Sequence, residues 1–153
     1  MRTETPVLNR CPFFAQFQPE HLQKLETLGS FVHFVKDQIL WEEEDRDTRL
    51  WVLLSGRVAL ERNLGGHLTL TDTLYPGDEL GWPGILDQKK EFRARALEPV
   101  DSLMLESREL RHAFDDDPHF ARAFLERLAG AMARHLLVAR RQLSRILATG
   151  VLR

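Results

Sequence analysis

The sequence predicts a small, mainly β domain, an antiparallel β-roll of the jelly-roll kind with flanking helices and a long C-terminal helix. The first observation is that short apolar runs between residues 30 and 106 are separated by close turn signals, the pattern of rolls and barrels. The second is a switch to helical periodicity in the last third of the chain. The third is a length of 153 residues with 43% hydrophobic and 29% charged residues, which suits one globular domain.

A short helix is predicted over Pro19–Leu28, because proline suits a first helical turn and leucines recur at helical spacing before Gly29. Strands are predicted over Phe31–Val35, Arg49–Leu54, Arg57–Arg62, His67–Tyr75, Arg93–Leu97 and Ser102–Leu105. Alternation in His67–Tyr75 puts Leu68, Leu70 and Leu74 on one face. Asp72 shares that inward face and is its one anomaly.

Two helices are predicted at the end of the chain. Ser107 is a plausible N-cap for a helix to about Phe114. The acids before Pro118 then favour the start of a second helix, which ends near Thr149 because Gly150 follows. We therefore divide the chain into a β-roll part (1–117) and a long helix of the same domain (118–153).

Apolar residues on the second helix recur in steps of four and three. A helix of roughly 30 residues spans about 45 Å, more than a domain of this size covers. The repeat therefore predicts a seam for a partner helix, most simply a second copy around a two-fold axis; a helix packed wholly on its own roll is the alternative. The seam consists of Leu125, Ala129, Met132, Leu136, Ala139, Leu143 and Ile146.

Charge is uneven along the chain. Residues 118–153 hold seven arginines and one acid, a net charge of about +6. Since the whole chain has a net charge of −2, the first 117 residues carry about −8. A basic helix can meet nucleic acid or a membrane surface, or it can simply face solvent and complement an acidic body. With one cysteine, no apolar leader and no membrane span, we expect a cytoplasmic protein without a membrane partner.

Four motifs in order resemble the cyclic-nucleotide-binding domain of catabolite-activator (Crp/Fnr) type regulators, from Phe13 to about Leu147. They are Phe13–Phe17 with Glu20-His21-Leu22, the strand-turn-strand Leu50–Val58, Leu74–Gly81, and Arg95–Glu98. The resemblance implies a roll that holds cAMP or cGMP, with the phosphate at a short helix N-terminus. It also implies an Arg and a Ser or Thr on the phosphate, a Glu on the ribose, and a long helix that closes over the base.

The predicted pocket departs from that pattern. Gly81 is kept, but Trp82 stands where the ribose-binding Glu is expected, Lys90 where the Arg is expected, and Glu91 where Ser or Thr is expected. If the alignment with the family pattern is shifted, Arg93 would supply the positive charge for the phosphate instead. Lysine lacks the planar fork that grips two phosphate oxygens, and a carboxylate repels the phosphate. The candidate pocket residues are Asp72, Leu80, Gly81, Trp82, Lys90, Glu91, His135, Ala139 and Arg140.

These departures predict a degenerate site that binds cAMP or cGMP weakly, or a different small ligand. One function is a regulatory sensor with an altered ligand; another is a ligand-free dimerisation module that serves an output partner. The sensor fragment of a longer transcription regulator also stays open. Without His-x-His pairs or a catalytic constellation, we expect neither an enzyme nor a metal site. The chain ends without room for a helix-turn-helix domain, so no sequence-specific DNA binding by this chain is expected.

Overall fold

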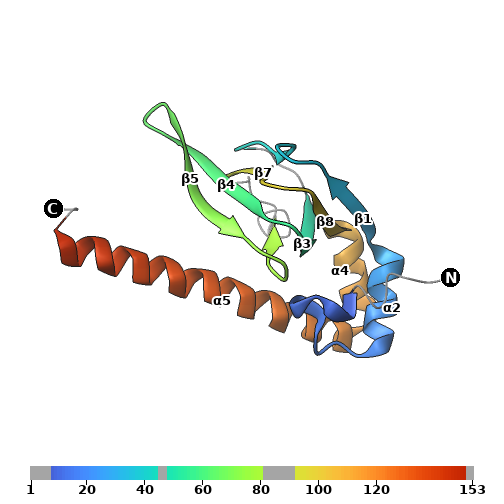
Figure 1. The fold of residues 1–153 in the computed structure, drawn as a ribbon. Coiled ribbons are helices and arrows are strands. Elements are labelled where there is room, and N and C mark those ends of the chain that lie inside the picture. The colour runs from blue at the N-terminus through green and yellow to red at the C-terminus, as the bar shows by residue number, and fades with distance from the viewer. Residues whose placement is uncertain (1–7, 45–47, 81–91, 151–153) are drawn as a thin grey trace.

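The computed structural model describes residues 8–44, 48–80 and 92–150 (Figure 1). A 3₁₀ turn, η1 (Pro12–Phe14), and helix α2 (Pro19–Leu28) precede the roll, and α4 (Ser107–Asp116) and α5 (Pro118–Thr149) follow it. The strands are β1 (Ser30–Phe34), β2 (Ile39–Trp41), β3 (Arg49–Ser55), β4 (Val58–Leu64), β5 (His67–Leu74), β6 (Glu79–Leu80), β7 (Arg93–Ala96) and β8 (Val100–Glu106).

The strands form two four-stranded antiparallel sheets. One has the order β1-β8-β3-β6 and the other β2-β7-β4-β5. The helices lie at one side of the roll, and α5 runs on past it to a free end (Figure 1). The predicted antiparallel β-roll with flanking helices and a long C-terminal helix is therefore confirmed.

Strand β3 separates two apolar cores. Leu50 and Val52 point to the helices, where they join a core rich in phenylalanine. Trp51 and Leu53 point between the two sheets, where Trp51 stacks on Trp41 with ring centroids 5.1 Å apart. The strand is therefore buried on both faces, as expected for its continuous apolar run.

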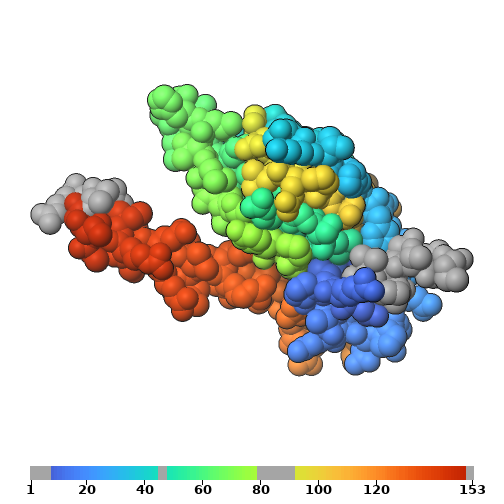
Figure 2. Space-filling view, in the orientation of Figure 1, coloured from blue at the N-terminus to red at the C-terminus, as the bar shows by residue number. Residues whose placement is uncertain are grey.

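Helix α5 belongs to the body over only its first half. Phe120, Phe124, Leu128 and Ala131 are buried in the helical core. Every residue from 136 to 149 is exposed, and Figure 2 shows this segment standing clear of the body. The Asp117 carboxylate accepts a hydrogen bond from the Phe120 N–H and caps the helix start, while Gly150 ends the helix in the left-handed conformation.

The predicted face of strand β5 is correct for Leu74 and Asp72 but wrong for Leu68 and Leu70. Asp72 lies opposite Leu60, but Leu70 lies opposite Glu61, so Thr71 is the extra residue of a β-bulge. A single inserted residue reverses the alternation. Leu74 is therefore buried in the inter-sheet core, whereas Leu68 and Leu70 lie on the opposite face and are about half exposed.

Two further details differ from the sequence prediction. Ser107 is the first residue of α4, and Glu106 occupies the N-cap position without a side-chain capping bond. The short strands β2 and β6 were not predicted, because three and two residues are too few for a periodic pattern to be recognised. The helix predicted over Pro19–Leu28 and the end of the long helix at Thr149 are confirmed.

The β3–β4 turn offers a test of the fold. Gly56 has φ of +87°, and an added Cβ would lie 2.3 Å from the Pro99 carbonyl oxygen. Gly66 has nearly the same φ, +89°, but open space around it. Gly56→Ala should lower the free energy of unfolding by at least about 2 kcal/mol more than Gly66→Ala, because both carry the strain of a left-handed residue and only one carries the clash. Urea unfolding of the two variants measures this difference, and equal losses would contradict the turn geometry.

Candidate ligand site

The inward-facing side chains of β4, β5 and β7 form one inner wall of the roll. Val58, Leu74, Ala94 and Ala96 are buried there in the inter-sheet core. Asp72 shares this face by register, since it lies opposite the inward residue Leu60. Its side chain is exposed, and its carboxylate accepts a hydrogen bond from the Thr73 N–H at 2.8 Å. In the described part of the chain, the inner wall is thus apolar, with the Asp72 carboxylate at its solvent side.

The outer face of the same sheet carries an ion-pair network around Glu61. Its carboxylate accepts hydrogen bonds from Arg95 at 2.9 Å and Arg93 at 3.2 Å, and Arg95 also donates to Asp37 at 2.9 Å. The Glu61 residue is 7% exposed. The hydrogen bond from Arg95, more than any other influence, holds the pKa of Glu61 below its ordinary value of 4.5. Both β7 arginines are therefore held in ion pairs on the outer face of the roll.

This arrangement decides one alternative left by the sequence. Residues 93–96 read Arg-Ala-Arg-Ala, and the strand alternates so that both alanines are buried inward and both arginines point outward. Arg93 is thus not placed to neutralise a phosphate inside the roll. The alternation was visible in the sequence, but the acid that holds the two arginines was not.

Helix α5 contacts the turn between β5 and β6 through the polar pair of His135 and Asp78. His135 Nε2 lies 3.3 Å from Asp78 Oδ1, and the two side chains are 31% and 19% exposed. The other oxygen of Asp78 accepts a hydrogen bond from the Tyr75 N–H at 2.8 Å. His135 was predicted as a pocket residue on the helix, whereas Asp78 lies within the motif Leu74–Gly81 and was not predicted as a site residue.

The remaining pocket residues are not brought together in the described part of the chain. Gly81, Trp82, Lys90 and Glu91 lie outside the described residues. The backbone of Leu80 pairs with Trp51 at the edge of its sheet. Ala139 and Arg140 are exposed on the free half of α5.

The seam residues lie along the exposed side of α5. Leu125, Leu136, Leu143 and Ile146 are 39–54% exposed, and Met132 packs partly against the helical core. Large exposed apolar side chains that recur along one side of a free helix are unusual for an isolated monomer. The dimer itself stays a prediction.

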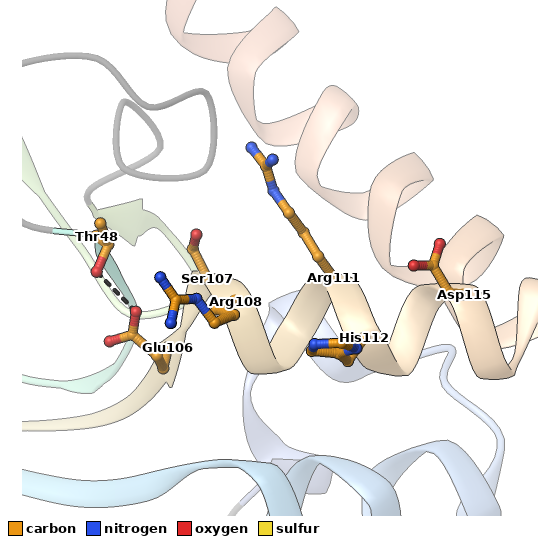
Figure 3. A pocket seen from close by; sticks show the side chains of 7 residues that line it. All are labelled: Thr48, Glu106, Ser107, Arg108, Arg111, His112 and Asp115. Carbon is orange, nitrogen blue, oxygen red and sulfur yellow. Dashed lines mark hydrogen bonds between the residues drawn. The ribbon is translucent and has the colours of Figure 1, made fainter.

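A polar hollow of about 440 Å³ lies at the start of α4, away from the predicted pocket (Figure 3). The Thr48 hydroxyl donates to Glu106 across its rim at 2.6 Å. Its lining mixes cations with acids, which gives no preference for one sign of ligand charge. The lining residues are Thr48, Glu106, Ser107, Arg108, Arg111, His112 and Asp115.

Among residues 8–44, 48–80 and 92–150, no group of three or more His, Cys, Asp or Glu side chains is placed to hold a metal ion. Within the same residues, no helix combines the length and apolar character that crossing a membrane requires.

Two four-stranded antiparallel sheets closed as a roll, with flanking helices and a long C-terminal helix, define the fold class of this chain. The model of the cyclic nucleotide-binding domain matches residues 31–117, more than half of the chain. The chain therefore belongs to the cyclic nucleotide-binding domain family, whose domains are typically non-catalytic regulatory modules.

Solved structures support the same fold. The N-terminal domain of a transcriptional regulator from Streptomyces coelicolor A3(2) is 27% identical, with a TM-score of 0.69 over 84% of this chain and 94% of that chain. A cyclic nucleotide-binding domain from Methylobacillus flagellatus KT is 20% identical, with a TM-score of 0.79 over 95% and 81%. The Thermus thermophilus catabolite activator protein is 23% identical, with a TM-score of 0.72 over 88% of this chain but only 62% of its own length. No curated protein matches.

The network around Glu61 predicts a pH-dependent contribution to stability. Glu61→Gln should lower the free energy of unfolding by roughly 1–3 kcal/mol at pH 7, because two arginines lose a charged partner. Since the pKa of Glu61 is lowered in the folded protein, this contribution is present above pH 4.5 and is lost as the pH falls through the lowered pKa. The difference from wild type should therefore shrink as the pH falls below 4.5 toward the lowered pKa.

Urea titrations at several pH values measure the effect. Glu126→Gln is the control, because Glu126 forms an exposed pair with Arg122 at 3.5 Å and should change stability by no more than about 1 kcal/mol. A loss for Glu61→Gln as small as that of the control would contradict the assigned role.

Proposed function

We propose that this chain is a dimeric regulatory module in which the roll takes a small ligand and α5 carries the response. The observation that carries the proposal is the free half of α5, where fourteen consecutive residues, 136–149, are exposed and an apolar seam continues through them. A helix that leaves its own body this way needs another surface to cover its apolar side. A second copy supplies an identical seam, which a two-fold axis makes self-complementary.

We further propose that the ligand is not a tightly held cAMP or cGMP. The sequence offers Lys90 and Glu91 where the family pattern has an Arg and a hydroxyl, and Trp82 where it has a Glu. The β7 arginines are held by Glu61 on the outer face, which supports a site short of cation. Asp72 adds a carboxylate on the inward side by register. This charge balance favours a ligand with less negative charge than a cyclic phosphate, or cyclic nucleotide bound only weakly.

The sensor part of a transcription regulator is the second candidate. It is favoured by the similar Streptomyces domain, which is the N-terminal domain of such a regulator. In that case the output is an attached DNA-binding part; otherwise an output protein binds the dimer.

The seam is tested by changes that leave the folded monomer untouched. Leu136→Glu with Leu143→Glu should convert the dimer to a monomer, because four carboxylates would then meet at the seam. Both leucines are about half exposed in the single chain, so the fold does not depend on them. Leu137→Glu with Ser144→Glu is the matched control, with the same spacing and charge on exposed positions outside the seam. Sedimentation velocity distinguishes the two states, and a dimer that survives the seam change would overturn the proposal.

The ligand assignment is tested by thermal-shift titration with cAMP and cGMP. Ligand at 100 times its Kd would stabilise the fold by about 2.7 kcal/mol, a shift of several degrees for a chain of this size. We expect little or no shift for wild type below millimolar nucleotide and a larger, saturable shift for Trp82→Glu with Glu91→Ser. A saturable micromolar shift of the wild type would show that the site is not degenerate.

A further inference from the structure

The turn between β5 and β6 presents a fixed carboxylate beside α5. Asp78 accepts hydrogen bonds from Leu53 N–H through its carbonyl at 3.0 Å and from Tyr75 N–H through its side chain. The same carboxylate lies 3.3 Å from His135, the last residue of α5 before the exposed segment begins. Asp78 therefore marks the point where the helix leaves the body.

The heptad positions show what a second helix would bring to this point. With Leu136 and Ala139 on the seam, His135 is at the g position just before Leu136, and Arg140 is at the e position just after Ala139. In a parallel pair of helices, a g side chain faces the partner's e side chain five residues further along the sequence. The partner of position 135 is therefore position 140.

We propose that Arg140 of a second copy pairs with the Asp78–His135 site, so that the dimer closes on the β5–β6 turn as well as on the seam. Arg140 is exposed and has no ion pair within the described part of its own chain. The Asp78 carboxylate of the other copy supplies a negative charge for the Arg140 guanidinium. By symmetry the contact forms twice. This inference rests on the dimer of the proposed function and adds its orientation and register.

The next e position, seven residues beyond Arg140, is Leu147, which is 54% exposed. The contact of Arg140 with the Asp78–His135 site requires a parallel dimer. In an antiparallel pair of helices, e positions face e positions, so Arg140 would not face position 135 of the second copy.

A mixing experiment tests the contact between copies. Asp78→Lys and Arg140→Glu each place like charges at both contacts of their own homodimer, so each should weaken dimerisation by roughly tenfold or more. When the two variants are mixed, both contacts of the heterodimer unite opposite charges. Native mass spectrometry of differently tagged chains should show heterodimer well above the statistical half. A statistical mixture would overturn the proposal.

A milder cycle covers the case in which Asp78→Lys fails to fold. Asp78→Asn keeps an acceptor for the Tyr75 N–H, and it is combined with Arg140→Gln. Each single change should weaken the dimer several-fold, and the double change should weaken it no more than the stronger single one, because both remove the same contact. Arg141→Gln, on the outer side of the helix, is the control and should leave the dimer Kd unchanged. Additive losses would overturn the contact. Monomers from Leu136→Glu with Leu143→Glu, together with additive losses here, would leave the proposed dimer intact and reject only its register.

Discussion

Strand β3 lies between two cores, and its side chains alternate between them. Leu50 and Val52 pack toward the helices, and Trp51 and Leu53 pack between the sheets, all at 2% exposure or less. A strand buried on both faces must be covered by a layer on each side. The second sheet covers one side, and α2, α4 and the start of α5 cover the other. Because burial of each large side chain is worth roughly 1.5–3 kcal/mol, this strand fixes where the layers sit.

The same requirement explains why α5 changes character along its length. Its first turns supply Phe120, Phe124 and Leu128 to the helical core, so the helix is held there by apolar contacts. After His135 no body remains beneath it, yet large apolar side chains continue along the seam, and Leu137 and Val138 are exposed beside it. A helix stabilised only by its own hydrogen bonds is marginal at this length. Packing against a second chain would stabilise the free half as a helix.

The sequence was sufficient for the order of elements, because apolar runs, turn residues and the heptad repeat are local signals. It failed where one residue changes the register. The bulge at Thr71 carries no local signature, yet it moves Leu68 and Leu70 to the opposite face. Pairings between distant residues were equally hidden. Glu61 lies 32 and 34 positions from its arginines, and Asp78 lies 57 positions from His135, so only the folded sheet and helix bring them together.

The β5–β6 turn connects the wall of the roll to the helix that carries the seam. Gly77 N–H donates to the Leu53 carbonyl at 2.8 Å, so the turn is held to the central strand, while Asp78 holds α5. A partly exposed pair such as His135–Asp78 contributes no more than about 1 kcal/mol, a factor of about five in an equilibrium. Two arrangements of α5 that differ by this contact would both be populated, and a ligand or a second chain with a modest preference for one of them would select it. A weak contact at this junction therefore suits a regulatory domain better than a strong one, which would hold the helix in one position whatever the roll contained.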